Sequence, residues 1–156
     1  AGIADPQRVC IYGGSFGAYS AVQSAAIEPD LYKCVIGASG VYDLEMLFDL
    51  GDVPASLYGL PYLNEVLGGE DHPTIKPYSP VHNVDKLKAP VLIVHGSADE
   101  RTPIEQAEAL EDALKEKGHP FKKLYIDNEY HGFITPEHRL TATETIIEFL
   151  NENIGD

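Results

Sequence analysis

The sequence is poor in basic residues and in long apolar runs, and each shortage excludes a class of partner. It has 11 lysines and arginines against 25 aspartates and glutamates, a formal net charge of −14. Nucleic-acid backbones are bound by basic surfaces, so we expect no nucleic-acid partner. No apolar run approaches the roughly 18–20 residues of a membrane-spanning helix, so we expect no membrane partner. The opening AGIADPQRV lacks the pattern of a signal peptide, and the compartment stays open.

Cysteine is also scarce, with Cys10 and Cys34 the only two. Both lie in apolar runs of the kind that form strands, and they make no CxxC pair. Metal or redox chemistry of cysteine is therefore not indicated. We expect two buried thiols that behave as small apolar side chains.

Short apolar runs alternate with helical patterns along the chain. The runs typical of buried parallel strands are residues 9–12, 34–38, 91–95 and 123–126. The helical patterns cover about residues 18–26, 103–117 and 137–153, and for the second we expect Thr102 as the N-cap and Gly118 as the stop. This alternation predicts an α/β fold, with a parallel sheet of about four strands and helices on both faces.

One long segment departs from the alternation. Residues 44–88, here called the excursion, hold five prolines, two short apolar helical patterns and the loop GGEDHPT. We expect the excursion to pass over the carboxyl edge of the sheet, where α/β proteins place their sites.

The most informative stretch is GGSFG, residues 13–17, which matches the pattern G-x-S-x-G. It follows a predicted strand and opens a predicted helix, which is the context that this motif requires. Such a turn raises the hydroxyl of Ser15 above the sheet edge, and we expect Gly13 and Gly17 to let the strand and the helix approach closely. The backbone N–H of Phe16, at the start of the helix, would face an anion that forms on a substrate.

A nucleophilic serine needs a base, and the base needs an acid that orients it. In this topology the acid and then the histidine follow the serine, each just past a strand. Asp99 follows the third strand and His131 the fourth, and we prefer Asp99 over its neighbour Glu100 and over Asp127. For His95, inside its strand, we expect a structural hydrogen bond. The other histidines fit the role of base less well: His72, His82, His119 and His138.

Four segments carry a resemblance to a known family: ADPQRVCIYGGSFGAYSA, EPDLYKCVIGASGVYDL, APVLIVHGSADERTPIEQAEALEDALKEKG and EYHGFITPEHRL. They resemble the prolyl oligopeptidase family of serine peptidases, and most of all its acylaminoacyl-peptidase and dipeptidyl-peptidase-like branches. The resemblance implies an α/β-hydrolase fold, attack by Ser15, acid–base catalysis by His131, orientation by Asp99, and short peptides as substrates. It also implies that four residues help to line the pocket for the residue before the cut bond: Phe16, Tyr42, Arg101 and Thr102.

The chain departs from that family in what precedes the serine. In the family, several strands, a second oxyanion donor and a β-propeller come earlier, whereas here the serine follows the first predicted strand. We therefore expect residues 1–156 to be the C-terminal part of a catalytic domain, with weak activity by itself. We also expect its exposed first strand to drive homo-oligomer formation.

Two other functions stay open at this point. One keeps the fold and makes the chain a small carboxylester or lactone hydrolase. The other makes it a catalytically silent, self-associating fragment. We expect no metal, because histidines and carboxylates lack ligand spacing on any one element, and no cofactor, because this chemistry needs none.

Overall fold

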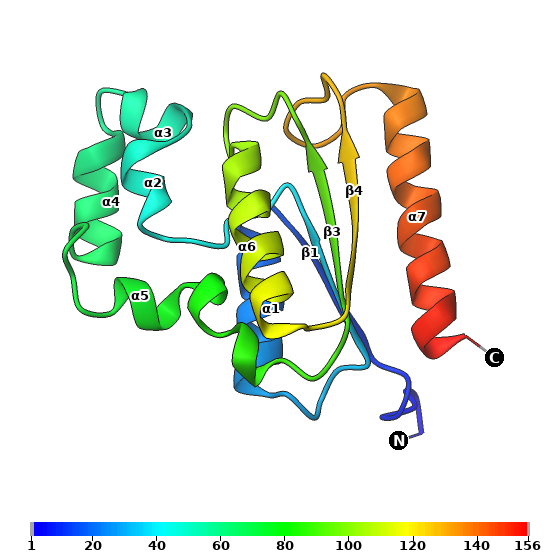
Figure 1. Cartoon of the computed structure of the whole chain (residues 1–156). Helices are drawn as coiled ribbons and strands as arrows, with labels where there is room; N and C mark the ends of the chain where they lie inside the picture. Colours follow the sequence, from blue (N-terminus) through cyan, green and yellow to red (C-terminus); the bar gives the residue numbers. More distant parts are fainter. Residues whose placement is uncertain (1, 156) are drawn as a thin grey trace.

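A single parallel sheet organises the chain, and the computed structural model describes residues 2–155 (Figure 1). The sheet order is β1-β2-β3-β4, and all neighbouring strands are parallel. The four predicted strands are all present, β2 with the predicted bounds and the others with one or both ends shifted by one or two residues: β1 (Cys10–Gly14), β2 (Cys34–Ala38), β3 (Val91–Gly96) and β4 (Phe121–Ile126).

Three long helices cover the two faces of the sheet, as Figure 1 shows. Helices α1 (Phe16–Ile27) and α6 (Ile104–Lys117) pack with Val35, Val91 and Ile93 on one face. Helix α7 (Pro136–Ile154) packs with Ile36, Leu92 and Val94 on the other. Successive strand residues point to opposite faces, and β2 and β3 are buried on both, so their residues are apolar or glycine, with His95 of β3 the one polar exception. The predicted α/β fold with helices on both faces is confirmed.

Residues 44–78 of the excursion form a small helical body beside the sheet, whereas the part that follows packs against α1 and α6 through Val84 and Leu87 (Figure 1). The core of the small body gathers Leu44, Phe48, Leu63 and Ile75 with the preceding Val41. The sequence patterns indicated two short helices, whereas prolines and glycines divide the segment further. It contains α2 (Met46–Asp49), α3 (Asp52–Ala55), α4 (Gly59–Leu67), α5 (Ile75–Tyr78) and the 3-10 turns η1 (Pro80–His82) and η2 (Val84–Lys86).

The expectation of two free thiols is wrong, because Cys10 and Cys34 form a disulfide. The two residues are direct partners in the register of β1 and β2, and their Cα atoms lie 4.6 Å apart. This separation is within the range that a disulfide spans. Strand register is a tertiary property, so the spacing of the cysteines in the sequence did not reveal the pairing.

The two predicted ends of helix α6 have different outcomes. Gly118 ends the helix in the left-handed conformation, with φ of 63°, as expected. Thr102 is not the N-cap: Pro103 occupies that position, and no side chain caps the helix. The Thr102 hydroxyl instead donates to the carbonyl oxygen of Ser39 and contacts Asp99, because it lies beneath the carboxyl edge of the sheet. No helix among the described residues is both long and apolar enough to cross a membrane.

Candidate active site

The turn between β1 and α1 holds Ser15 in a left-handed conformation, with φ of 56°. Its backbone N–H donates to the carbonyl of Ala38 at 2.9 Å, which fixes the turn against β2. A Cβ on Gly13 would lie 2.0 Å from the carbonyl oxygen of Gly17, so only glycine allows this close approach of strand and helix. A Cβ on Gly17 would meet nothing within 4 Å, so our expectation that the close approach also needs a glycine at position 17 is wrong.

Three side chains from distant parts of the sequence lie in a continuous line at the carboxyl edge of the sheet. The Nε2 atom of His131 lies 3.1 Å from Ser15 Oγ. The Nδ1 atom of the same ring lies 2.8 Å from Asp99 Oδ2 and 3.1 Å from its Oδ1. The three residues follow β1, β3 and β4 in the order that the sequence predicted.

The carboxylate of Asp99 is held by several donors. The backbone N–H groups of Arg101 and Thr102 donate to Oδ1, at 3.0 and 2.9 Å. The hydroxyl of Thr102 lies 3.1 Å from Oδ2 and 3.3 Å from His131 Nδ1. Asp99 is buried, whereas the rival acids Glu100 and Asp127 are exposed. Asp99 is the carboxylate that the structure brings to His131, and its orientation is fixed by the turn that follows β3.

His95 makes the structural hydrogen bond that we expected. It is fully buried, and its Nε2 lies 2.7 Å from the carbonyl oxygen of Thr102, so Nε2 carries the proton and donates it. Burial lowers the pKa of His95, against smaller opposing effects of the Thr102 carbonyl and the Asp99 charge. A neutral ring therefore packs beside Asp99, whose Oδ2 lies 3.7 Å from His95 Nε2. Three of the other histidines have partners elsewhere: His72 at Thr74, His119 at the Ala89 carbonyl and His138 at Glu129.

A mostly apolar cavity of about 340 Å³ opens beside Ser15. Three of the residues implied by the resemblance line it, namely Phe16, Arg101 and Thr102. Tyr42 does not, because its side chain is fully buried in the core and its neighbour Val41 reaches the cavity instead. The remaining wall comes from six side chains of the excursion: Leu47, Val53, Tyr62, Leu63, Val66 and Leu67. The sequence showed the apolar helical patterns of this segment, but it did not predict that these side chains line a pocket.

The excursion is tied to the loop that carries Asp99. The guanidinium of Arg101 pairs with the carboxylate of Asp52 at 2.9 Å, and the Asp52 N–H donates to the carbonyl of Glu100, also at 2.9 Å. These contacts hold the cavity wall in place relative to the three aligned side chains. Arg101 also lies in the wall of the cavity, where it offers one positive charge.

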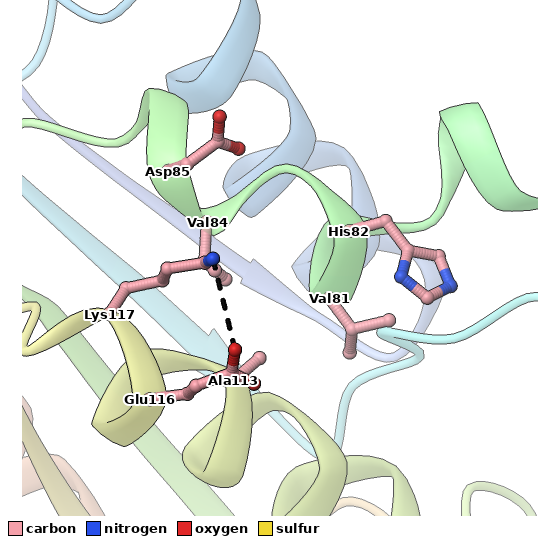
Figure 2. A pocket seen from close by; sticks show the side chains of 7 residues that line it. All are labelled: Val81, His82, Val84, Asp85, Ala113, Glu116 and Lys117. Carbon is pink, nitrogen blue, oxygen red and sulfur yellow. Dashed lines mark ion pairs between the residues drawn. The ribbon is translucent and has the colours of Figure 1, made fainter.

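Two other groups of residues lie apart from this arrangement. Figure 2 shows a hollow between η1, η2 and α6, where Lys117 pairs with Glu116 and the side chains of His82 and Asp85 point in different directions. Asp43, Glu45 and His82 place ligand atoms within 4.8 Å of one another, but Glu45 also lies 3.5 Å from Lys76. Neither group includes Ser15, Asp99 or His131.

Comparison with known proteins finds several similar peptidases. The chain is 30% identical to the acylamino-acid-releasing enzyme of Arabidopsis thaliana over 87% of its length, and 26% identical to dipeptidyl aminopeptidase BIII of Pseudoxanthomonas mexicana over 99%. A puromycin-hydrolyzing peptidase of Mycobacterium tuberculosis superposes with a TM-score of 0.85 at 29% identity, over 99% of this chain. An acylaminoacyl peptidase of Pyrococcus horikoshii does so with a TM-score of 0.86 at 25% identity, over 97%.

The chain spans only part of these proteins, from 18% to 23% of the two curated relatives and from 23% to 25% of the two solved structures. The model of the prolyl oligopeptidase family matches residues 1–156. The fold is thus the α/β-hydrolase fold of these peptidases, and the chain belongs to the prolyl oligopeptidase family.

Proposed function

We propose that the chain carries the catalytic centre of a serine peptidase that cleaves short peptides. The observation that supports this most is the unbroken line of contacts from Ser15 Oγ through His131 to Asp99. These are the contacts by which a serine nucleophile, its base and an orienting acid work together. The shared family supports a peptide bond as the target.

The proposed reaction proceeds through an acyl-enzyme. Ser15 Oγ bonds to the carbonyl carbon of the substrate as its proton passes to His131 Nε2, and Asp99 stabilises the imidazolium that forms. The imidazolium then protonates the leaving amine, and the carbon–nitrogen bond breaks. Water, deprotonated by the same ring, hydrolyses the ester and restores Ser15. The N–H of Phe16, at the positive end of α1, is our candidate donor to the oxyanion.

The cavity beside Ser15 supports a preference for a large apolar side chain next to the cut bond. Its wall is mostly aliphatic and aromatic, which favours burial of an apolar group of the substrate. We expect slow turnover by this chain alone, because the described residues offer one oxyanion donor at the turn. The lack of a second donor costs on the order of a hundred- to a thousandfold.

The direct test is intact-mass analysis after treatment with a fluorophosphonate. In this reaction Ser15 Oγ bonds to phosphorus, fluoride leaves, and His131 takes the hydroxyl proton. We expect one adduct on the chain and none on the Ser15→Ala variant. No adduct on the folded wild-type chain would contradict an activated serine and would favour the silent fragment. If the probe labels Ser15 and the chain cleaves esters but no peptide, the ester or lactone hydrolase would be favoured.

We also propose that the chain self-associates through β1. Among residues 2–155, β1 pairs only with β2, and Tyr12 on β1 is 58% exposed. An edge strand with open backbone groups favours pairing with a second copy. Light scattering should give a dimer or larger mass that falls toward the monomer in Tyr12→Lys, because a charged side chain blocks edge pairing. A monomer mass for the wild type at every concentration would contradict this proposal.

A further inference from the structure

One buried carboxylate next to the candidate site takes no part in the proposed reaction. Glu129 lies two residues before His131 and is fully buried. Its Oε1 accepts hydrogen bonds from the backbone N–H groups of Tyr130 at 3.2 Å, Ile134 at 2.6 Å and Thr135 at 3.3 Å. Its Oε2 lies 2.5 Å from Nδ1 of His138, in the first turn of α7. The donors come from residues before and after His131 in the sequence, so the Glu129 carboxylate holds both ends of the loop that carries the base.

The loop around His131 needs such a clamp because its backbone is strained. Phe133 has φ of 57°, in the left-handed region that bulky residues rarely adopt, and Asn128 and Gly132, which tolerate this region better, have φ of 56° and 85°. Conformations of this kind cost energy and persist only where surrounding contacts enforce them. The hydrogen bonds to Glu129 stabilise this loop conformation, and the buried ring of Phe133 packs the loop against α7.

Glu129 also connects the base to the acid. Its backbone carbonyl accepts the N–H of Ala98 at 3.0 Å, next to Asp99. Glu129 therefore contacts both loops: its carboxylate binds the loop that carries His131, and its backbone carbonyl binds the loop that carries Asp99. The separation of 2.8 Å between His131 Nδ1 and Asp99 Oδ2 depends on the relative position of these loops.

We propose that Glu129 is a positioning residue that holds His131 between Ser15 and Asp99. This inference rests on the proposed function, in which His131 is the base. Displacement of a catalytic group by about 1 Å can slow a reaction about a hundredfold. Glu129 therefore determines the rate of the chemical step without touching the substrate.

The charge of Glu129 suits this role. Burial raises the pKa of the carboxyl, but hydrogen bonds from Thr135, His138 and Ile134 outweigh it and lower the pKa to about 2. The carboxylate is thus ionised at neutral pH, and its hydrogen bonds to the loop are charge-assisted. It also lies at the N-terminal end of α7, where a negative charge is favoured.

The chain contains a matched control. Glu111 is also buried, accepts hydrogen bonds from Lys115, Lys123 and Tyr125, and has no contact with the candidate triad. Burial raises its pKa, but these three partners outweigh it and lower the pKa to about 2. Replacement of Glu111 should therefore destabilise the fold as replacement of Glu129 does, without moving His131.

The experiment compares Glu129→Ala, Glu129→Gln and Glu111→Ala by the kinetics of fluorophosphonate labelling. In Glu129→Ala we expect the maximal labelling rate to fall about a hundredfold while the probe concentration for half-maximal rate stays unchanged, because the cavity is intact. Glu129→Gln keeps one oxygen for the loop amides and should recover most of the rate, to within about tenfold of the wild type. Glu111→Ala should stay within about threefold. Equal losses in Glu129→Ala and Glu111→Ala, or no loss in either Glu129 variant, would overturn the proposal.

A second measurement separates this inference from the proposed function. The Nδ1 proton that His131 shares with Asp99 gives an NMR signal whether or not Ser15 reacts. We expect that signal in the wild type and in Glu111→Ala, and its weakening or loss in Glu129→Ala. A signal lost in Glu129→Ala, together with an unlabelled wild type, would support the positioning role and contradict the peptidase. A signal unchanged in both Glu129→Ala and Glu129→Gln would contradict the positioning role itself.

Discussion

The variant Asp99→Asn is expected to label with fluorophosphonate about 10⁴-fold more slowly than the wild type, with its fold intact. The fold should persist because an asparagine oxygen still accepts the N–H groups of Arg101 and Thr102, which now donate to Asp99 Oδ1. The amide nitrogen then lies where Oδ2 is, against His131 Nδ1.

The labelling rate should fall because the new amide N–H and the N–H at Nδ1 of His131 are both hydrogen-bond donors and cannot bond to each other. With an amide N–H against Nδ1, the proton of His131 moves to Nε2 and points at Ser15 Oγ, which lies 3.1 Å away. A ring in that tautomer cannot accept the serine proton. The measurement is the maximal labelling rate by mass spectrometry, beside circular dichroism to verify the fold.

Two neighbouring acids supply the controls. Glu100 and Asp127 are exposed, and the only carboxylate within hydrogen-bonding distance of His131 among the described residues is Asp99. Glu100→Gln and Asp127→Asn should therefore label at nearly the wild-type rate. A large loss in either control with little change in Asp99→Asn would transfer the orienting role to that residue.

The second large effect is expected on stability, from Gly13→Ala. A Cβ at this position would lie 2.0 Å from the oxygen and 2.3 Å from the carbon of the Gly17 carbonyl. Both atoms belong to the backbone of α1, so the helix has to move away from β1 to make room. Overpacking of this kind costs typically 1–3 kcal/mol, and we expect a loss of about 3 kcal/mol in the free energy of unfolding. Urea unfolding followed by circular dichroism measures it.

Gly17→Ala is the matched control within the same turn. Its Cβ would meet nothing within 4 Å, and Gly17 lies inside α1. Alanine is favoured over glycine in a helix by up to about 1 kcal/mol, so this variant should be as stable as the wild type or slightly more stable. Equal stability losses in the two variants would show that the close approach of strand and helix at Gly13 does not limit stability.

The sequence alone determined the features that depend on local pattern. Buried parallel strands are mostly apolar, and the apolar composition of residues 34–38 and 91–94 predicted β2 and β3. The turn at Ser15 requires a strand, a serine and a helix in succession, and all three are local. The order of Ser15, Asp99 and His131 follows from the strands that they succeed, because parallel strands end at one edge of the sheet.

Tertiary structure decided what depends on register and on the direction of side chains. Cys10 and Cys34 form a disulfide because the pairing of β1 with β2 places them opposite each other. Both Tyr42 and Val41 are buried, but Tyr42 packs in the core under α1 and α6 while Val41 lines the cavity, since the chain after β2 turns the two side chains to different sides. The role that we propose for Glu129 depends on donors that meet only when β4, its loop and α7 are packed together. Sequence patterns record periodicity along one element, whereas these contacts join several elements, and only the folded chain brings them within hydrogen-bonding distance.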